Sequence, residues 1–333
     1  MKAFVVKNYG KKKELTLREV SKPRLRENEV MVEIYSAGLN QLDTKILSGE
    51  FKMILPYKTP FTLGHDLAGI VIETGSKVTK FKIGDEVYAR PSDHHIGTFA
   101  EYLAVEVKDL ALKPKNLSME EAAGVPLVSL TAWQALVEIG KVKKGQKVFI
   151  QAGSGGVGVV AIQLAKYLGA TVATTAGKAS FQMLRELGAD VLIDYKTQDF
   201  EAILKDYDLV LNSQDNNTLQ KSLNVVKSGG KIISISGPPT PAFALEIGAS
   251  WIIRTVLSIL SSGVRRKAKR KAVDYQFLFM KSSGKQLEQI TKLIEDGHIK
   301  TVIEKVYPFS QTNEAMRHVA SERAKGKIVV KIK

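Results

Sequence analysis

The sequence predicts an α/β protein with two parts, a β-rich, barrel-like part and a doubly wound parallel sheet. Two observations support this division. From Lys147 onward, short β-branched runs alternate with helical patterns, which indicates repeated βα units and therefore a parallel sheet. Before Ser118, short strand-like runs are instead separated by glycines and turns, as in a small barrel. The 333 residues suffice for two domains that each bury a sizeable core.

The β-rich part supplies the first group of expected strands. They are Lys2–Lys7, Glu29–Ala37, Leu67–Glu73, Glu86–Ala89 and Ala100–Val105. A capping-box pattern at 118–121 then predicts the start of a helix, and Thr131–Ile139 continues helically. Strand character returns at the end of the chain, in Val302–Val306 and Lys327–Ile332, after a helix at Gln286–Ile294. We infer that the chain's end rejoins the first domain, so that 1–120 and 299–333 form one domain and 121–298 the other.

The parallel sheet is predicted from five strand candidates with helices between them. The strands are Val148–Ile150, Thr171–Thr175, Val191–Asp194, Leu209–Leu211 and Ile232–Ile235. The helices are Val157–Leu168, Ala179–Leu187 and Thr218–Val226. Ligands of such sheets bind at the carboxyl ends of the strands.

A glycine-rich turn follows the first of these strands. Gly153, Gly155 and Gly158 have G-x-G-x-x-G spacing, and a helical pattern follows them. In this context the glycines permit a tight turn, close approach to a pyrophosphate, and close packing of helix on strand. The helix N-terminus offers free N–H groups and partial positive charge to the phosphates. We therefore predict dinucleotide binding, with the pyrophosphate surrounded by Ser154, Gly155, Gly156, Val157 and Gly158.

Composition excludes several kinds of site. The chain has no cysteine, which rules out disulfides, thiolate zinc sites, iron–sulfur clusters and cysteine nucleophiles. We see neither a signal peptide nor an apolar run of the ~18 residues that span a membrane, and expect a cytoplasmic protein. The formal charge of +15 is unusual. We attribute it to lysines on solvated faces, with attraction to nucleic acid or anionic lipid as alternatives.

One segment, Ala249–Lys271, combines an apolar stretch with a basic end, since six of the seven residues 265–271 are Lys or Arg. We expect a helix that caps the substrate cleft and ends in a solvated basic tail. An amphipathic membrane-surface helix or a nucleic-acid patch is the alternative.

Several stretches resemble the motifs of one enzyme family. They are Gly38–Asp43 (G-x-N-x-x-D), Thr62–Val71 (G-x-D-x-A-G-x-V), Gly84–Tyr88, Gly97–Tyr102, Ala122–Leu136 and Ala152–Gly158. Together they resemble the medium-chain dehydrogenase/reductase superfamily, in its zinc-independent quinone oxidoreductase branch, and most of all its NADPH-dependent quinone and enone reductases. The resemblance spans the whole chain. It implies a Rossmann domain inserted into a discontinuous GroES-like β-barrel catalytic domain, and commonly a homodimer.

NADPH is the expected coenzyme. No acidic residue lies between Gly158 and Glu186, although NAD-preferring domains place a carboxylate there for the ribose. The second strand ends near Thr175, an expected coenzyme contact, and Lys178 just beyond it offers a positive charge to a 2′-phosphate. The resemblance adds further contacts with the coenzyme, from Tyr195, Arg323, Thr131, Ser236 and Gly237.

A metal is not expected. Zinc-dependent members of the superfamily have a cysteine where Asn40 stands, another near Leu127, and the histidine that corresponds to His65. Of these only His65 remains, and a catalytic zinc needs three protein ligands. Oxygen ligands from Asp43, Asp66 and Glu101 are the alternative. The adjacent pair His94 and His95 is expected to be solvated.

The expected reaction is therefore hydride transfer to an acceptor that is already electrophilic, a quinone or an enone. Negative charge would develop on the acceptor's oxygen, where hydrogen-bond donors lower the barrier. The candidate donors are Asn40, Lys45 and His65. The alternatives are an enoyl-thioester reductase and an NADPH-binding protein that works by binding nucleic acid.

Overall fold

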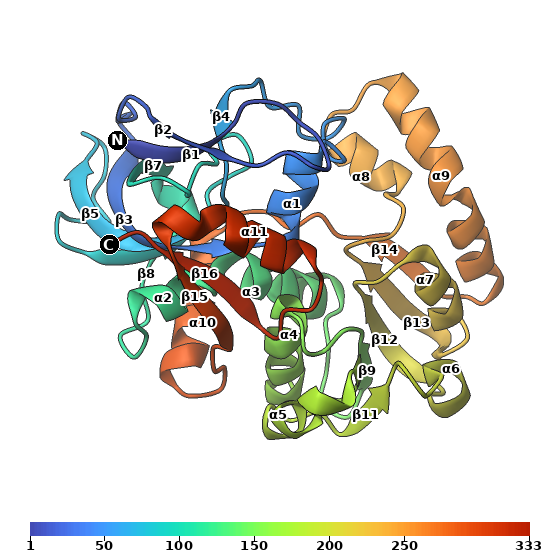
Figure 1. The fold of residues 1–333 in the computed structure, drawn as a ribbon. Helices are drawn as coiled ribbons and strands as arrows, with labels where there is room; N and C mark the ends of the chain where they lie inside the picture. The colour runs from blue at the N-terminus through green and yellow to red at the C-terminus, as the bar shows by residue number, and fades with distance from the viewer. The chain divides into compact units, whose positions relative to one another are not determined.

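The computed structural model describes residues 1–333, which form two compact units. One unit contains Met1–Leu130 together with Lys281–Lys333, and the other contains Thr131–Met280. Figure 1 shows the C-terminal strand β16 (Lys327–Lys331) among the strands of the N-terminal part of the chain. The first unit is therefore discontinuous, with the second unit inserted into it.

The second unit is built on a parallel sheet of six strands. They are β9 (Lys147–Ile150), β10 (Thr171–Ala176), β11 (Val191–Asp194), β12 (Tyr207–Asn212), β13 (Val226–Ser234) and β14 (Asp274–Phe277). Their order is β11-β10-β9-β12-β13-β14, and every neighbouring pair is parallel. Counted from β9 this is the order 3-2-1-4-5-6 of the doubly wound dinucleotide-binding fold. The predicted parallel sheet is confirmed, with β14 as a sixth strand.

Helices connect these strands. They are the end of α3 (Pro126–Trp133) with a π-helix at Gln134–Ile139, then α4 (Gly156–Tyr167), α5 (Phe181–Glu186), α6 (Phe200–Ile203), α7 (Asn216–Ser222), α8 (Pro241–Glu246) and α9 (Trp251–Arg270). The helix predicted at Thr218–Val226 is wrong at its C-terminal end. Helix α7 stops at Ser222, and Val226 already pairs with Tyr207 in the sheet. Burial of Val225 and Val226 in the core of the unit outweighs their helical spacing.

The first unit consists of two mainly antiparallel sheets. The smaller one contains β1 (Lys2–Val6), β2 (Thr16–Glu19) and β4 (Phe61–Thr62). The larger one has the order β15-β16-β3-β5-β6-β8, with β7 also paired to β3. Its strands are β3 (Glu29–Leu39), β5 (Asp66–Thr74), β6 (Glu86–Ala89), β7 (Tyr102–Glu106), β8 (Leu110–Leu112), β15 (Ile303–Pro308) and β16. Because β16 is antiparallel to β3, the end of the chain completes the sheet that its beginning starts.

Four α-helices belong wholly to this first unit. They are α1 (Gln41–Ser48), α2 (Met119–Ala123), α10 (Gly284–Glu295) and α11 (Thr312–Ala320). The capping box predicted at 118–121 is present, since Ser118 and Glu121 exchange hydrogen bonds. Helix α10 packs on β8, and the Tyr88 hydroxyl donates a hydrogen bond to the Leu287 carbonyl at 2.8 Å. Residues 281–298 and 121–130 therefore cluster with the first unit, whereas we had assigned them to the second.

Candidate functional site

The glycine turn between β9 and α4 is tightly packed against the sheet. A Cβ at Gly153 would lie 2.1 Å from the Thr174 hydroxyl, and one at Gly158 would lie 2.5 Å from the Ala152 carbonyl. Neither position has room for a side chain. Gly155, which precedes the first residue of α4, is different because a Cβ there would meet only the Ala152 carbonyl, at 3.4 Å. The turn thus packs closely on one side and leaves its backbone N–H groups approachable at the start of a 12-residue helix.

Thr175 holds this turn in place. Its hydroxyl accepts a hydrogen bond from the Ala152 amide at 3.1 Å, and its carbonyl accepts one from the Gly153 amide at 2.9 Å. Ala152 has a positive φ of 51°, which reverses the chain direction directly after the strand. Thr175, a predicted coenzyme contact, therefore positions the turn through bonds to its backbone.

The end of β10 carries no carboxylate. Lys178 is exposed, and the structure describes no hydrogen bond or ion pair for its ammonium group. Tyr195 follows β11 and is 63% exposed. The parallel pairing of Ala176 with Asp194 brings these strand ends together, so that a Cβ at Gly177 would lie 3.9 Å from the Tyr195 ring. Lys178 and Tyr195 thus share the carboxyl edge of the sheet.

A chain of hydrogen bonds fixes the ends of the central strands. Gln151 accepts from the Asn212 amide at 2.6 Å, and Asn212 accepts from the Ser234 hydroxyl at 2.5 Å. Ser234 in turn accepts from the Gly237 amide at 2.8 Å. The exposed Ser236 hydroxyl donates to a neighbouring backbone carbonyl at 2.6 Å. The relay therefore places the predicted residues Ser236 and Gly237 at the same edge as the glycine turn.

In the first unit, His65 and Asp43 form a fully buried pair. His65 Nδ1 lies 2.7 Å from Asp43 Oδ1, and both side chains are 0% exposed. The other Asp43 oxygen accepts from the Asn40 backbone amide at 2.8 Å, at the start of α1. His65 Nε2 is buried and has no hydrogen-bond partner in the protein. An orphaned nitrogen on an oriented ring is suited to a ligand's polar atom.

Asn40 belongs to a second buried cluster, centred on Lys327. The Lys327 ammonium donates to Asn40 Oδ1 at 2.5 Å and lies 3.1 Å from an Asp66 oxygen. That same Asp66 oxygen accepts from the Asn40 side-chain amide at 2.9 Å, and the other accepts from the Leu127 backbone amide at 2.8 Å. Lysine thus neutralises the buried carboxylate and fixes the Asn40 amide.

The remaining predicted residues are placed more simply. Lys45 is half-buried on α1, and the structure describes no partner for its ammonium group. Thr131 is 4% exposed on α3, and Arg323 is exposed just before β16.

Sequence reasoning gave Tyr57 no polar role. Its hydroxyl is buried without a hydrogen-bond partner. Burial raises the pKa of the Tyr57 phenol far above its usual value, and the negative charges of Asp93 and Asp43 raise that pKa further. Tyr57 therefore stays protonated as a hydrogen-bond donor. Only the residue type hinted at this role; the partnerless burial is visible in the structure alone.

Three side chains of types that can bind a metal ion lie close together elsewhere in this unit. Glu29, His95 and Glu106 have ligand atoms within 4.8 Å of one another. The Arg26 guanidinium lies 3.0 Å from His95 Nε2, and the Lys108 ammonium pairs with Glu106. Two cations thus already accompany the two carboxylates, which makes the cluster a poor cation site.

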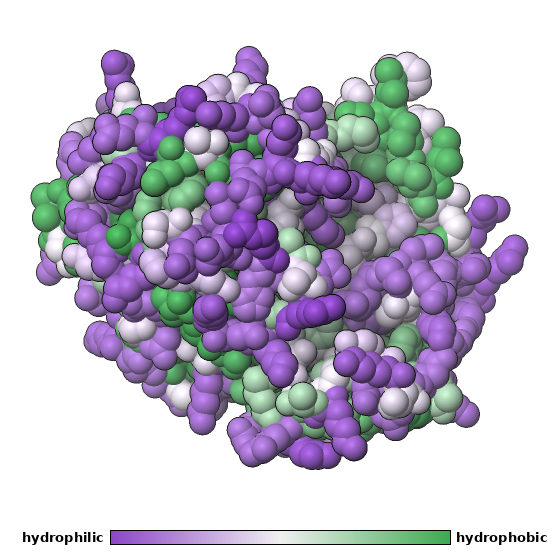
Figure 2. Space-filling view, viewed as in Figure 1, coloured by the Kyte–Doolittle hydropathy of each residue, from purple (hydrophilic) through white to green (hydrophobic).

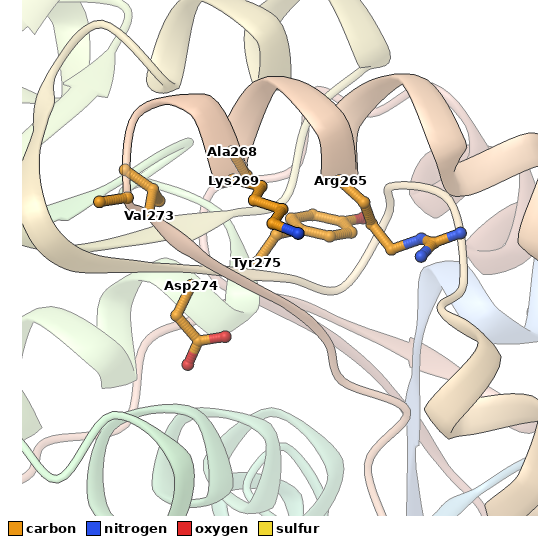
Figure 3. Close-up of a pocket in the computed structure, with 7 residues that line it drawn as sticks. Arg265, Ala268, Lys269, Val273, Asp274 and Tyr275 are labelled. Carbon is orange, nitrogen blue, oxygen red and sulfur yellow. The ribbon is translucent and has the colours of Figure 1, made fainter.

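A shallow cavity of about 380 Å³ lies between the C-terminal half of α9 and β14 (Figure 3). Its polar lining comes from Arg265, Lys269, Asp274 and Tyr275. None of the predicted coenzyme or catalytic residues lines it. Burial raises the pKa of Tyr275 to about 12, and its hydroxyl donates to the Pro238 carbonyl at 2.9 Å.

Comparison with known proteins identifies the family. Residues 26–115 match the alcohol dehydrogenase GroES-like domain, and residues 187–330 match the family described as zinc-binding dehydrogenase. The NADPH-dependent alkenal/one oxidoreductase of Arabidopsis thaliana is 34% identical over 341 residues, which cover 99% of this chain and 79% of that protein.

Solved structures similar to this chain support the same family. The quinone oxidoreductase from Coxiella burnetii has a TM-score of 0.88 and 30% identity over 100% of this chain and 99% of that one. The Escherichia coli quinone oxidoreductase complexed with NADPH has a TM-score of 0.84 and 25% identity over the full length of both chains. With its GroES-like domain and inserted Rossmann sheet, this chain belongs to the medium-chain dehydrogenase/reductase superfamily, among its quinone oxidoreductases and alkenal/one reductases.

Proposed function

We propose that the protein is a zinc-independent, NADPH-dependent reductase that transfers a hydride to a quinone or to an α,β-unsaturated carbonyl. The observation that carries the proposal is a contrast within the chain. The dinucleotide turn is intact, whereas the position that holds zinc in other members has one imidazole, His65, already paired with Asp43. Relatives of this chain are named as an NADPH-dependent alkenal/one oxidoreductase and as a quinone oxidoreductase, which supports the same substrate classes here.

The residues present fit NADPH. The turn at 153–158 and the start of α4 would hold the pyrophosphate, and Lys178 with Tyr195 would hold the 2′-phosphate end. No carboxylate at the end of β10 opposes that phosphate. When bound, the coenzyme supplies the hydride.

The donor set argues against a catalytic zinc. His65 Nε2 is the one imidazole nitrogen available there, and the neighbouring oxygens of Asn40 and Asp66 already bind the Lys327 ammonium. A divalent cation would have to share these oxygens with a buried positive charge. Without a Lewis acid, an alcohol hydroxyl is not activated, and an electrophilic acceptor is the better substrate.

His65 and Tyr57 are the proposed donors to the acceptor's oxygen. The Asp43 carboxylate orients the His65 ring through Nδ1, which leaves Nε2 as the ring atom that would donate to the acceptor's oxygen. Nε2–H and the Tyr57 hydroxyl then stabilise the enolate or hydroquinonate as it forms, and His65 can release its proton to it. Asp43 is a positioning residue because it sets the ring's orientation. Lys45 remains a candidate donor, and Asn40, fixed by Lys327 and Asp66, a candidate contact.

An NADPH-oxidation screen tests the proposal. We expect turnover with quinones or with alkenals and enones, and a kcat/KM for NADPH above that for NADH. Faster turnover of crotonyl thioesters than of simple enones would instead assign the enoyl-thioester reductase. Stoichiometric zinc in the active protein, or no turnover of any acceptor class, would contradict the proposed zinc-independent reductase. Nucleic-acid binding that survives high salt would favour the binding-protein alternative.

We also propose a homodimer and a cytoplasmic location. Strand β14 is the last strand of its sheet, so its outer edge pairs with no other strand of the chain. An exposed strand edge can pair with the same edge of a second copy around a two-fold axis. No helix of the structure has both the length and the apolar character of a transmembrane span. Sedimentation velocity and cell fractionation test these two expectations.

A further inference from the structure

Helix α9 contacts its own unit through a narrow stripe. Of its 20 residues, the buried ones are Leu257, Ser261, Val264 and Ala268. Their spacing of four, three and four residues marks a single face of the helix. Val264 and Ala268 join the core of the parallel-sheet unit. The rest of the circumference faces solvent along most of the helix.

The outward face of the first half of α9 is apolar. Trp251 is 73% exposed, Ile252 56%, Ile259 67% and Leu260 61%. Helix α8 packs beside α9 and adds the exposed Leu245. Figure 2 shows a green, hydrophobic area where Figure 1 places α8 and the start of α9. Contiguous apolar patches are uncommon on soluble monomers and mark a binding surface.

The outward face of the second half of α9 is basic. Five residues of that half are Lys or Arg, the whole helix contains no Asp or Glu, and Lys271 follows directly. The structure describes no ion pair for any of these cations. Ile252, Ile259 and Arg266 succeed one another at intervals of seven residues, so the apolar and basic halves point the same way.

We propose that this outward face of α9 docks on an anionic membrane surface. Ile252, Ile259 and Trp251 would enter the headgroup–acyl boundary, while Arg266 and Arg270 would contact lipid phosphates. Insertion of apolar side chains and attraction of basic side chains to lipid phosphates are each weak. Together they give stable peripheral binding, whereas one alone does not. The proposal does not depend on the reductase activity, since it uses none of the coenzyme or donor residues.

The positive charge of α9 favours an anionic membrane over a second copy of the chain as the partner of this face. A two-fold contact through α9 would offer its unpaired cations no Asp or Glu from the partner's α9, within a protein of net charge +15. An anionic lipid surface neutralises them instead. The cavity beside α9 is not part of the proposed surface, because the Asp274 carboxylate in its lining would repel a phosphate.

The test uses the full chain and unilamellar vesicles of phosphatidylcholine alone or mixed equally with phosphatidylglycerol. We expect cosedimentation with the mixed vesicles only, weakening with salt. A blue shift of tryptophan emission should accompany binding and disappear in Trp251→Phe, which leaves Trp133 in place. NADPH oxidation with a soluble quinone, measured on the same samples, reports the active site separately.

Matched variants distinguish binding through α9 from non-specific attraction by the protein's net positive charge. Ile259→Ser should weaken binding roughly tenfold, while Ile83→Ser, at a similarly exposed isoleucine of the other unit, should not. Arg266→Glu with Arg270→Glu should weaken binding roughly a hundredfold or more. Lys11→Glu with Lys12→Glu changes the net charge equally and should have a small effect.

Three results would overturn the proposal. The first is equal binding to neutral and mixed vesicles, or none. The second is equal loss in the α9 variants and their matched controls, which would mean non-specific attraction. The third is self-association at vesicle-free concentrations that Ile259→Ser abolishes, which would assign the apolar patch to a second copy.

Discussion

Replacing His65 tests the proposed donor most directly. The ring is 0% exposed, its Nδ1 lies 2.7 Å from Asp43 Oδ1, and its Nε2 has no partner. His65→Gln can keep a hydrogen bond to Asp43 while removing the Nε2 proton. Loss of one donor to a developing oxyanion costs ~10²–10³ in kcat, or ~3–4 kcal/mol of transition-state stabilisation. We expect kcat with an enone to fall roughly a hundredfold.

The harsher His65→Phe leaves the Asp43 carboxylate with the Asn40 amide as its remaining described partner. An uncompensated buried charge destabilises a fold by ~3–5 kcal/mol, so a lower Tm should accompany this variant but not His65→Gln. The assay is steady-state kinetics with both substrates varied. KM for NADPH should stay within about threefold, because the donor's loss acts on the transition state and not on coenzyme binding. A kcat for His65→Gln within twofold of the parent, in a protein of unchanged Tm, would refute the role of His65. His95→Gln is the control, since that ring lies in the other cluster.

Three further outcomes are expected. Lys178→Glu should raise KM for NADPH about thirtyfold and leave that for NADH nearly unchanged, because a charge-assisted contact becomes a repulsion; parallel changes for both coenzymes would contradict this. Gly158→Ala should abolish measurable NADPH binding and lower Tm, because its Cβ would lie 2.5 Å from the Ala152 carbonyl; normal binding by fluorescence titration would disprove the close packing. Burial raises the pKa of Tyr275 to about 12, above the unfolded value of ~10. Its contribution to stability is complete below pH ~10 and declines as the pH rises towards 12, by about 2 kcal/mol. Urea unfolding of Tyr275→Phe should show a flatter alkaline loss than the parent, and identical slopes would exclude this residue as the cause.

The parallel sheet was predictable because each predicted strand is a run rich in β-branched residues, with glycine or charged residues on either side. Strand β14 was not, since Asp274–Phe277 has no such run and is a strand through its pairing with β13. Likewise, the helical spacing before Val226 gave no sign that burial would turn this segment into a strand.

The candidate site was predictable in its residues but not in its pairings. The glycine turn is local, so spacing alone described it. Asp43 and His65 stand 22 residues apart, and Asp66 and Lys327 stand 261 apart, so their contacts depend on the completed sheets. The segment Ala249–Lys271 was expected to form a helix that caps the substrate cleft and ends in a solvated basic tail, and the structure makes residues 251–270 a helix. The structure buries Leu257 and Val264 in the narrow stripe that packs on the unit's core and leaves Trp251, Ile252, Ile259 and Leu260 exposed.

The position of Lys327 has a consequence for biosynthesis. A ribosome that has made the first 130 residues has made neither Lys327, the counter-ion of Asp66, nor β16, one of the strands that pair with β3. The contiguous unit 131–280 can fold before the first unit is complete, since residues 1–130 lack β15 and β16 until residues 303–331 have been made. The buried Asp66 carboxylate thus gains its counter-ion late in synthesis, whereas the Asp43–His65 pair lies wholly within residues 1–130.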